Sequence, residues 1–512
     1  MTTLQPRAEC LAALRQVLDQ PEAQRVLESA DLLFEAGDVH SSIQEYSRLL
    51  AAGTDLPLAP VWLRVAAAHI ARYHFEAASL ALEESTKAAR IEGCPDEVAF
   101  RHPLLMGRLL YLRGHLDEAE GACQRALNQA RASRSAGWTA TAHMELGRIA
   151  YRRGQIRRAR THYQSALPRY REESCRKHIA SALDNIALCE KTAGRLASAE
   201  PLLSEALGIS ESIGYVVGII ASRTHGSNIA FWLGRWQRAR DWARRALDRA
   251  SSCGDLPRAD LARLCLGRVL THLGDEPEGD SSLRQVFGQS AGRQARAIAA
   301  AYLAQAALLH GRTDDAEAWI QRAQEAAPAP PAFPDLAAEI QRLRVELAVA
   351  RGDGARALVE LQNALPVLLQ IRDLREIAAA GRLAGAALTL LGQHEPAHRR
   401  LTRSLRLASR IGIPYETAQI EEALAALAER RGEVGVAGAH LARARAIALE
   451  LGARPLLVRL GEAEATLAGT AADTPPAPER QETDGEVGHP ASITPDNTLT
   501  HNELLHRHII LS

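Results

Sequence analysis

The chain has 512 residues, with 61 Lys and Arg against 61 Asp and Glu, so its formal net charge is zero. This balance gives no overall support for non-specific nucleic-acid binding, and we expect no direct nucleic-acid partner. Apolar residues make up 46% of the chain, but no window approaches the roughly 18 unbroken apolar residues of a membrane-spanning helix, so we expect no membrane association.

The N-terminal residues carry neither the basic nor the apolar region of a secretory signal. The chain has seven cysteines and no Cys-x-x-Cys pair, which favours a reduced, cytoplasmic compartment. Residues 1–24 are predicted to form an N-terminal capping helix, and a helical array is expected to begin near residue 25. Its first turn falls at Gly37, and Tyr73 and His74 occupy the second turn, where no glycine stands.

Farther along the chain, glycines recur at a spacing of 20 residues: Gly194, Gly214, Gly234, Gly254, Gly274, Gly392, Gly412, Gly432 and Gly452. Glycine just past a helix end readily adopts the left-handed backbone that closes the helix. Every second glycine therefore marks a helix pair of about 40 residues, from Gly114 onward. This self-similarity predicts an all-α, right-handed superhelical solenoid of about eleven helix-turn-helix repeats.

Small residues stand on both sides of each turn. Five positions after the turn glycine, no side chain is larger than methyl in nine copies: Ala119, Ala159, Ala199, Ala239, Gly279, Ala316, Ala357, Ala397 and Ala437. Seven positions before the glycine, Gly107, Gly147 and Gly267 are equally small. The pattern predicts that the two helices of a pair touch closely beside the turn.

Proline-rich stretches divide the array. Residues 327–334 are predicted to be a loop between repeats 1–8 (25–326) and repeats 9–11 with a C-terminal cap (335–469). Residues 470–512 mix prolines with acidic residues, and we expect this tail to be disordered.

The repeat signature points to a family. Leu146, Gly147, Tyr151, Gly154 and Ala159, followed by Tyr163, Ala166 and Leu167, resemble the tetratricopeptide (TPR) repeat, although the period here is 40 residues rather than 34. Long repeats of this kind are similar to the arrays of large bacterial LuxR-type and SARP-type regulators. The resemblance implies a non-catalytic scaffold, regulatory or accessory to biosynthesis, that captures a protein or peptide in its concave groove.

In a TPR-like stack, the first helix of each pair lines the groove. The positions about six, three and two before the turn glycine are basic, aromatic or amide-bearing, and they give the predicted binding residues: Arg108, Tyr111, Arg148, Tyr151, Arg152, Lys191, Asn228, Phe231, Trp232, Arg268 and His272. Arginine forks and ring faces suit an acidic or C-terminal peptide segment. The lysine–asparagine arrangement of carboxylate-clamp TPRs is absent. Some of the rings could instead pack between neighbouring first helices.

Two alternatives stay open. The arginine clusters of residues 101–172 and 235–249 could be ordinary solvated helix surface. The chain could also be an enzyme whose catalytic residues are spread over several repeats, although it has no phosphate-binding loop, no nucleophile elbow and no His-Glu-x-x-His motif. We therefore expect no catalytic residue, no cofactor and no metal. A closed pocket would favour the enzyme, whereas a continuous groove would favour the scaffold. The sequence leaves the oligomeric state open.

Overall fold

The computed structural model describes residues 22–35, 38–51, 57–327 and 334–472, which fold into 23 α-helices without a β-strand. The predicted capping helix before residue 22, most of the proline-rich loop and the tail after residue 472 lie outside the described residues. The last helix continues to Ala472, three residues into the segment predicted as tail, because the alanines at its end favour helix.

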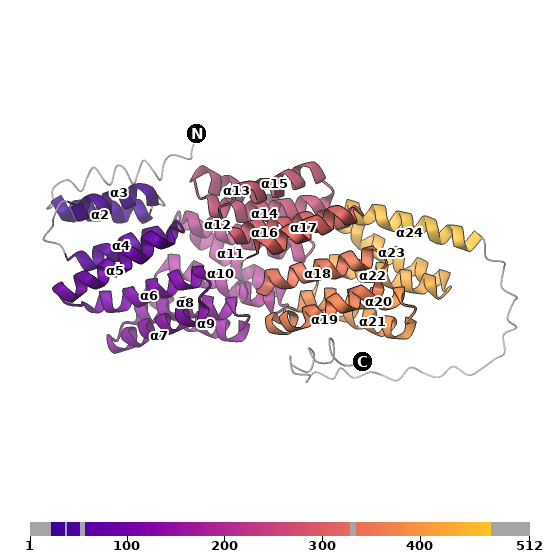
Figure 1. Cartoon of the computed structure of the whole chain (residues 1–512), viewed down its shortest axis with the longest axis horizontal. Coiled ribbons are helices and arrows are strands. Elements are labelled where there is room, and N and C mark those ends of the chain that lie inside the picture. The colour runs from indigo at the N-terminus through magenta and orange to yellow at the C-terminus, as the bar shows by residue number, and fades with distance from the viewer. Residues whose placement is uncertain (1–21, 36–37, 52–56, 328–333, 473–512) are drawn as a thin grey trace.

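Eleven helix pairs follow one another along the chain, which confirms the all-α solenoid of about eleven repeats (Figure 1). The first helices are α2 (Glu22–Glu35), α4 (Leu58–Ala71), α6 (Asp96–Arg113), α8 (Ala136–Arg152), α10 (Arg176–Thr192), α12 (Val216–Trp232), α14 (Leu256–Leu273), α16 (Arg293–Leu309), α18 (Pro334–Ala350), α20 (Leu374–Leu390) and α22 (Pro414–Arg430). The second helices are α3 (Val39–Ala51), α5 (Phe75–Glu92), α7 (Leu116–Ala132), α9 (Ile156–Glu172), α11 (Leu196–Ser212), α13 (Trp236–Ser252), α15 (Glu276–Gln289), α17 (Thr313–Ala326), α19 (Gly354–Ile371), α21 (His394–Ile411) and α23 (Val434–Leu451). A final helix, α24 (Arg454–Ala472), covers the last pair.

The turn glycines have the predicted left-handed backbone. Gly154, for example, has a φ of +74°, and its N–H donates to the carbonyl of Tyr151 over 2.9 Å, closing α8. The same 20-residue spacing continues at three positions without glycine, where Arg134, Ser174 and Arg372 have φ values of 52°, 54° and 51°. The repeat is therefore more regular than the glycines alone indicate, because other residues also adopt the left-handed turn.

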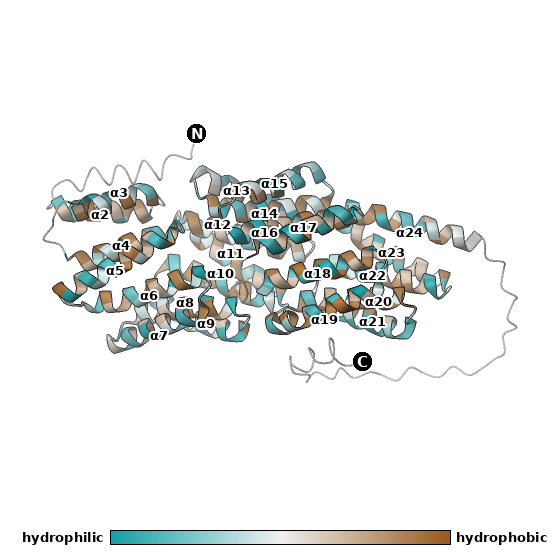
Figure 2. Cartoon of the chain, viewed as in Figure 1, coloured by the Kyte–Doolittle hydropathy of each residue, from teal (hydrophilic) through white to brown (hydrophobic). Residues whose placement is uncertain are grey.

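Small residues let the paired helices touch, as the sequence predicts. Ala159 is fully buried, and a methyl group added at Gly147 would lie 2.5 Å from the ring of Tyr163. Apolar faces run along the whole array and alternate with hydrophilic ones (Figure 2). The core is therefore a series of small contacts that repeats from one pair to the next.

Replacing Gly147 with alanine should lower the free energy of unfolding by about 1–3 kcal/mol, because the buried Tyr163 ring must move. The matched control is Gly121→Ala in α7, where an added methyl meets only Arg125, at 3.9 Å. That change should stabilise the chain by about 0.5–1 kcal/mol through helix propensity. Urea unfolding of the two variants checks the prediction, and equal effects would mean that the assigned repeat phase is wrong.

Neighbouring first helices contact one another from α4 to α22, so they form the inner layer of the superhelix. The second helices form the outer layer, where arginines pair with carboxylates about one repeat earlier in the chain. Arg158 lies 2.5 Å from Glu120, and Arg238 lies 2.6 Å from Glu200. Much of the arginine richness of α9 and α13 therefore belongs to exposed contacts between repeats, each contributing ~0–1 kcal/mol.

The superhelix closes on itself after five repeats. A methyl group at Gly194, in the turn of repeat 5, would lie 2.9 Å from Leu374 at the start of repeat 10. One repeat farther along, Gly234 faces Pro414 in the same way. Trp236 and Leu441, from the two halves of the chain, belong to one buried cluster. Repeats 9–11 therefore pack against the turns of repeats 4–7, which brings α18 and α20 close to the first helices of earlier repeats.

Candidate functional site

The inner face of α12 carries a stripe of polar side chains without hydrogen-bond partners. Ser222, His225, Asn228 and Trp232 follow one another at intervals of three or four residues, so they lie on one side of the helix. In each of them a buried atom (Oγ, Nδ1, Oδ1 and Nε1, respectively) has no hydrogen-bond partner in the described part of the chain. His225 Nδ1 lies 3.6 Å from the Asp184 carboxylate, and Ser222 is buried. Buried polar groups are normally hydrogen-bonded, so the unused capacity for a ligand or for water lies mainly at Asn228 and Trp232.

Two cations flank the stripe. Arg268 of α14 lies 3.8 Å above the ring of Phe231 and 4.8 Å above that of Trp232, and donates to the Tyr302 hydroxyl over 3.0 Å. Its other terminal nitrogen, Nη2, has no hydrogen-bond partner among the residues that the structure describes. Lys191 of α10 has no ion pair or hydrogen bond with any described residue. These cations therefore add positive charge beside the polar stripe.

The opposite wall comes from the second superhelical turn. Arg375 of α20 lies 4.5 Å from the ring of Trp232 on the inner face. Its guanidinium donates to Asp373 in a bidentate pair, with Nε 3.0 Å from Oδ1. Trp232 is thus contacted by one arginine from each superhelical turn. We call Lys191, Asn228, Trp232, Arg268 and Arg375 the inner site.

Electrostatics indicate that the inner site is recessed. Burial, together with repulsion from Arg375, lowers the pKa of the half-buried Lys191 to about 8. Asp335 at the start of α18 is exposed to solvent, yet desolvation by the surrounding protein and repulsion from Asp373 raise the pKa of its carboxyl. The surrounding protein therefore desolvates both groups, although each keeps contact with solvent.

Lys191→Met should raise the free energy of unfolding at pH 7 by about 1–2 kcal/mol, a value discounted for the partial exposure of the side chain. The pKa of about 8 in the folded chain lies below the ordinary 10.5, so folding disfavours the charged form. The penalty is complete below pH 8 and disappears as the pH rises toward 10.5. The gain should therefore vanish over that range in urea unfolding. Lys87→Met, at an exposed lysine, should show no such trend, and a pH-independent gain would contradict the burial of Lys191.

The N-terminal part of the predicted groove is already internally paired. Arg148 contacts Glu145 at 2.6 Å, and Arg152 lies 4.8 Å from the ring of Tyr111 and donates to the carbonyl of Tyr111. The Tyr151 hydroxyl lies 3.0 Å from Thr192 Oγ1. Arg108 is exposed on α6, outside the inner site. The structure thus brings Lys191, Asn228, Trp232 and Arg268 together, whereas Arg108, Tyr111, Arg148 and Arg152 lie outside the inner site in the earlier repeats.

Phe231 and His272 lie in the joint between the superhelical turns. They are 4% and 2% exposed, and their rings meet edge to face at 4.9 Å. Tyr415 contacts His272 from the second turn. Burial lowers the pKa of His272 to about 3, so the ring is neutral at pH 7, consistent with an Nδ1–H that donates to the Arg268 carbonyl over 2.8 Å. Both residues contact Arg268, Phe231 through its ring and His272 through the hydrogen bond to the Arg268 carbonyl.

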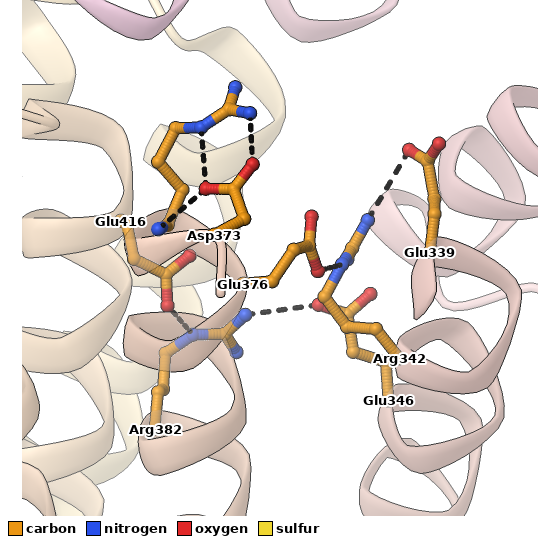
Figure 3. A network of polar contacts seen from close by, with 8 residues as sticks. Glu339, Arg342, Glu346, Asp373, Glu376, Arg382 and Glu416 are labelled. Carbon is orange, nitrogen blue, oxygen red and sulfur yellow. Dashed lines mark hydrogen bonds and ion pairs between the residues drawn. The ribbon is translucent and has the colours of Figure 1, made fainter. Parts of the chain in front are cut away.

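Farther along the inner face, α18, α20 and α22 share a charged network (Figure 3). Arg342 contacts Glu346 at 2.9 Å and Glu376 at 3.2 Å, and Arg382 joins Glu346 to Glu416. Burial raises the pKa of Glu376 to about 7 against the opposing pull of Arg342. Unlike the inner site, this network joins its charges into a connected chain of ion pairs.

Three further features concern metal binding, small-ligand binding and membrane spanning. Within the described residues, no group of three or more His, Cys, Asp or Glu side chains could hold a metal ion. A hollow between α18, α19 and α20, lined mostly by apolar side chains with Arg342 and Glu376, has a cavity volume of only about 10 Å³, far below the ~300–1,000 Å³ of common ligand pockets. No helix in the described part of the chain is long and apolar enough to span a bilayer.

The second superhelical turn contributes residues to the site that the sequence pattern did not predict. Arg375 and Asp335 follow the proline-rich segment and carry no groove signal of their own. They reach the inner site only because the superhelix closes after five repeats. A pattern read within single repeats contains no information on that contact.

Comparison with known proteins agrees with the repeat architecture. Tetratricopeptide-repeat family models match residues 100–172, 144–212 and 282–331. No curated protein matches the chain. Similar solved structures include a Rap protein complexed with competence and sporulation factor, at 12% identity over 76% of this chain and 98% of that one, with a TM-score of 0.46. NprR in complex with its cognate peptide NprX is 13% identical over 68% of this chain and 100% of its own, also with a TM-score of 0.46. A signal-transduction ATPase with a tetratricopeptide-repeat sensor from Pyrococcus horikoshii is 14% identical over 62% and 52%, with a TM-score of 0.43.

Proposed function

Because this chain is a tetratricopeptide-repeat protein, we propose that it is a non-catalytic scaffold that binds a protein or peptide partner on the inner face of its superhelix. Superhelical repeat arrays use their concave surfaces for binding. The observation that carries the proposal is the pair of buried polar atoms of Asn228 and Trp232 on α12, next to Lys191 and Arg268, which have no hydrogen-bond partner among the described residues. A peptide main chain supplies donors and acceptors at regular intervals and could satisfy both atoms.

The charge of the inner site favours an acidic or C-terminal segment. Arg375 is neutralised by Asp373. Neither Lys191 nor Arg268 forms an ion pair with a carboxylate of the described residues, although Asp335 and Asp373 attract Lys191 from farther away. A carboxylate between these two cations would relieve their mutual repulsion and form charge-assisted hydrogen bonds. The indole N–H of Trp232 offers a further donor.

Selection from a random peptide library displayed on phage tests this function directly. Full-length chain should enrich peptides with clustered Asp and Glu, and selection with free C-termini should enrich a terminal carboxylate. The selected peptides should lose binding at high salt, since exposed charge pairs are screened over ~8–10 Å at moderate ionic strength. Enrichment of basic or purely apolar peptides would refute the acidic preference.

One observation favours an enzyme as the second candidate function. Lys191 titrates near pH 8 beside two carboxylates that interact with it, those of Asp335 and Asp373, and shifted groups of this kind are frequent in active sites. A catalytic lysine would lose its role on conversion to arginine. A binding lysine would keep most of its affinity for a carboxylate after the same change, because the charge remains.

A further inference from the structure

The outer face of α21 carries a ridge of arginines. Arg399, Arg403, Arg406 and Arg410 are spaced by four, three and four residues, which aligns them along one side of the helix. Arg399, Arg406 and Arg410 are exposed, and none of the three has an ion-pair partner among the described residues. We call these four residues the arginine ridge.

Several exposed arginines on other outer helices of the array are paired. On α9 and α13, exposed arginines such as Arg158 and Arg238 contact a carboxylate of the preceding repeat. On α21, the acidic side chain at the start of the helix is Glu395. It forms an ion pair with Arg431, at 2.8 Å. Like charges at these helical intervals repel one another, so an anion beside Arg399, Arg406 and Arg410 would relieve repulsion along the ridge.

The chain itself contains a matching anion. Residues 473–512 carry seven acidic residues against two arginines, so the rest of the chain has an excess of five positive charges. Glu482, Asp484 and Glu486 alternate along this segment. In an extended strand, alternate side chains point to the same side at intervals of ~6.5–7 Å. Successive arginines at i, i+4 and i+7 are ~4.5–6 Å apart along the helix axis. Their long side chains can adjust to the wider spacing of the acidic side chains.

We propose that the acidic segment 479–486 binds the arginine ridge of α21 in the same molecule. This contact would place the segment on the convex face, away from the inner site, and would keep other acidic ligands off the ridge. The proposal is independent of the partner-binding function, since it concerns a different helix and a different surface.

The connection is long enough. Near its end, α24 reaches the start of α23, where Leu467 lies 3.9 Å from the position of a methyl group at Gly438. The turn before α23 contacts the start of α21 through Arg431 and Glu395. Because adjacent helices are ~8–10 Å apart, the end of α24 and the start of the ridge lie on one edge, about two helix spacings apart. The ten residues from Ala472 to Glu482 span up to ~33 Å.

Zero-length cross-linking of the full-length chain tests the proposal. The chain has only three lysines, Lys87, Lys177 and Lys191, so Arg399→Lys with Arg406→Lys adds charge-conserving sites against a low background. A carbodiimide should join the introduced lysines to carboxylates of 479–486, as read by peptide mass spectrometry. Conjugation should persist on dilution and should fall sharply in about 0.5 M salt, where the Debye length is only a few Å.

Two controls make the outcome decisive. Arg245→Lys places an exposed lysine on α13, far along the array, and should not capture the segment. Glu482→Gln with Asp484→Asn and Glu486→Gln should reduce conjugation to the ridge several-fold. Equal capture at 245 and on the ridge, conjugates found only between two chains, or no conjugate with the segment would each overturn the proposal.

Discussion

Arg342→Met is expected to lower the free energy of unfolding at pH 7 by about 3–5 kcal/mol, because removing one partner of a buried ion pair leaves the others uncompensated. The side chain of Arg342 is only 10% exposed and faces Glu339, Glu346 and Glu376. Methionine keeps most of the side-chain volume, so the loss reports charge rather than packing. Urea unfolding at pH 7 measures it.

The loss should shrink toward pH 5. Without Arg342, burial would keep the pKa of Glu376 above its ordinary value, so this carboxyl would take up a proton and the repulsion would fall. Arg351 is the control, since it pairs with exposed carboxylates on α17, and Arg351→Met should leave the unfolding midpoint close to that of the unmodified chain. A small, pH-independent effect of Arg342→Met would show that the network contributes little to the closed superhelix.

Replacing Lys191 and Arg268 together with methionine is expected to weaken binding of a selected acidic peptide by two to four orders of magnitude. Each charge-assisted hydrogen bond contributes ~1.5–3 kcal/mol, and about 1.4 kcal/mol changes the dissociation constant tenfold. Calorimetric titration of the double variant measures the loss. Arg244→Met with Arg245→Met on the convex α13 removes the same charge and should change affinity by less than about threefold.

The same titration has a predicted pH dependence. Lys191 has a pKa of about 8 in the free chain, and a bound carboxylate would raise it. Affinity should therefore be constant below pH 8 and fall above it, with proton uptake on binding near pH 8 to 9. Affinity that stays constant up to pH 10 would show that Lys191 does not contact the ligand.

Much of the fold was predictable because each repeat specifies itself locally. Gly154 and its equivalents mark the turns, and Gly147 with Ala159 fixes which helix faces meet. The turns at Arg134, Ser174 and Arg372 could not be found from the glycines, because a non-glycine residue adopts the left-handed backbone there. Their side chains carry no turn signal, so only the spacing could have identified them.

The candidate site was predictable only in part. The first-helix rule identified Lys191, Asn228, Trp232 and Arg268, which lie together on the inner face. It also selected Phe231 and His272, whose rings are buried against each other, with His272 in contact with Tyr415 of the second superhelical turn. That contact joins residues more than 140 positions apart, and it depends on how far the superhelix turns at each repeat. Small rotations add up over five repeats, and no single repeat encodes their sum.

Site-specific photo-cross-linking tests the central claim most directly. Replacing Asn228 with p-benzoylphenylalanine places a reactive group on the inner stripe, and the same replacement at Arg245 places it on the convex face. With a selected acidic peptide, we expect strong cross-linking from position 228, lost when Lys191 and Arg268 are also methionine, and little from position 245. Cross-linking from 245 but not from 228, by chains that still bind the peptide, would contradict binding on the inner face.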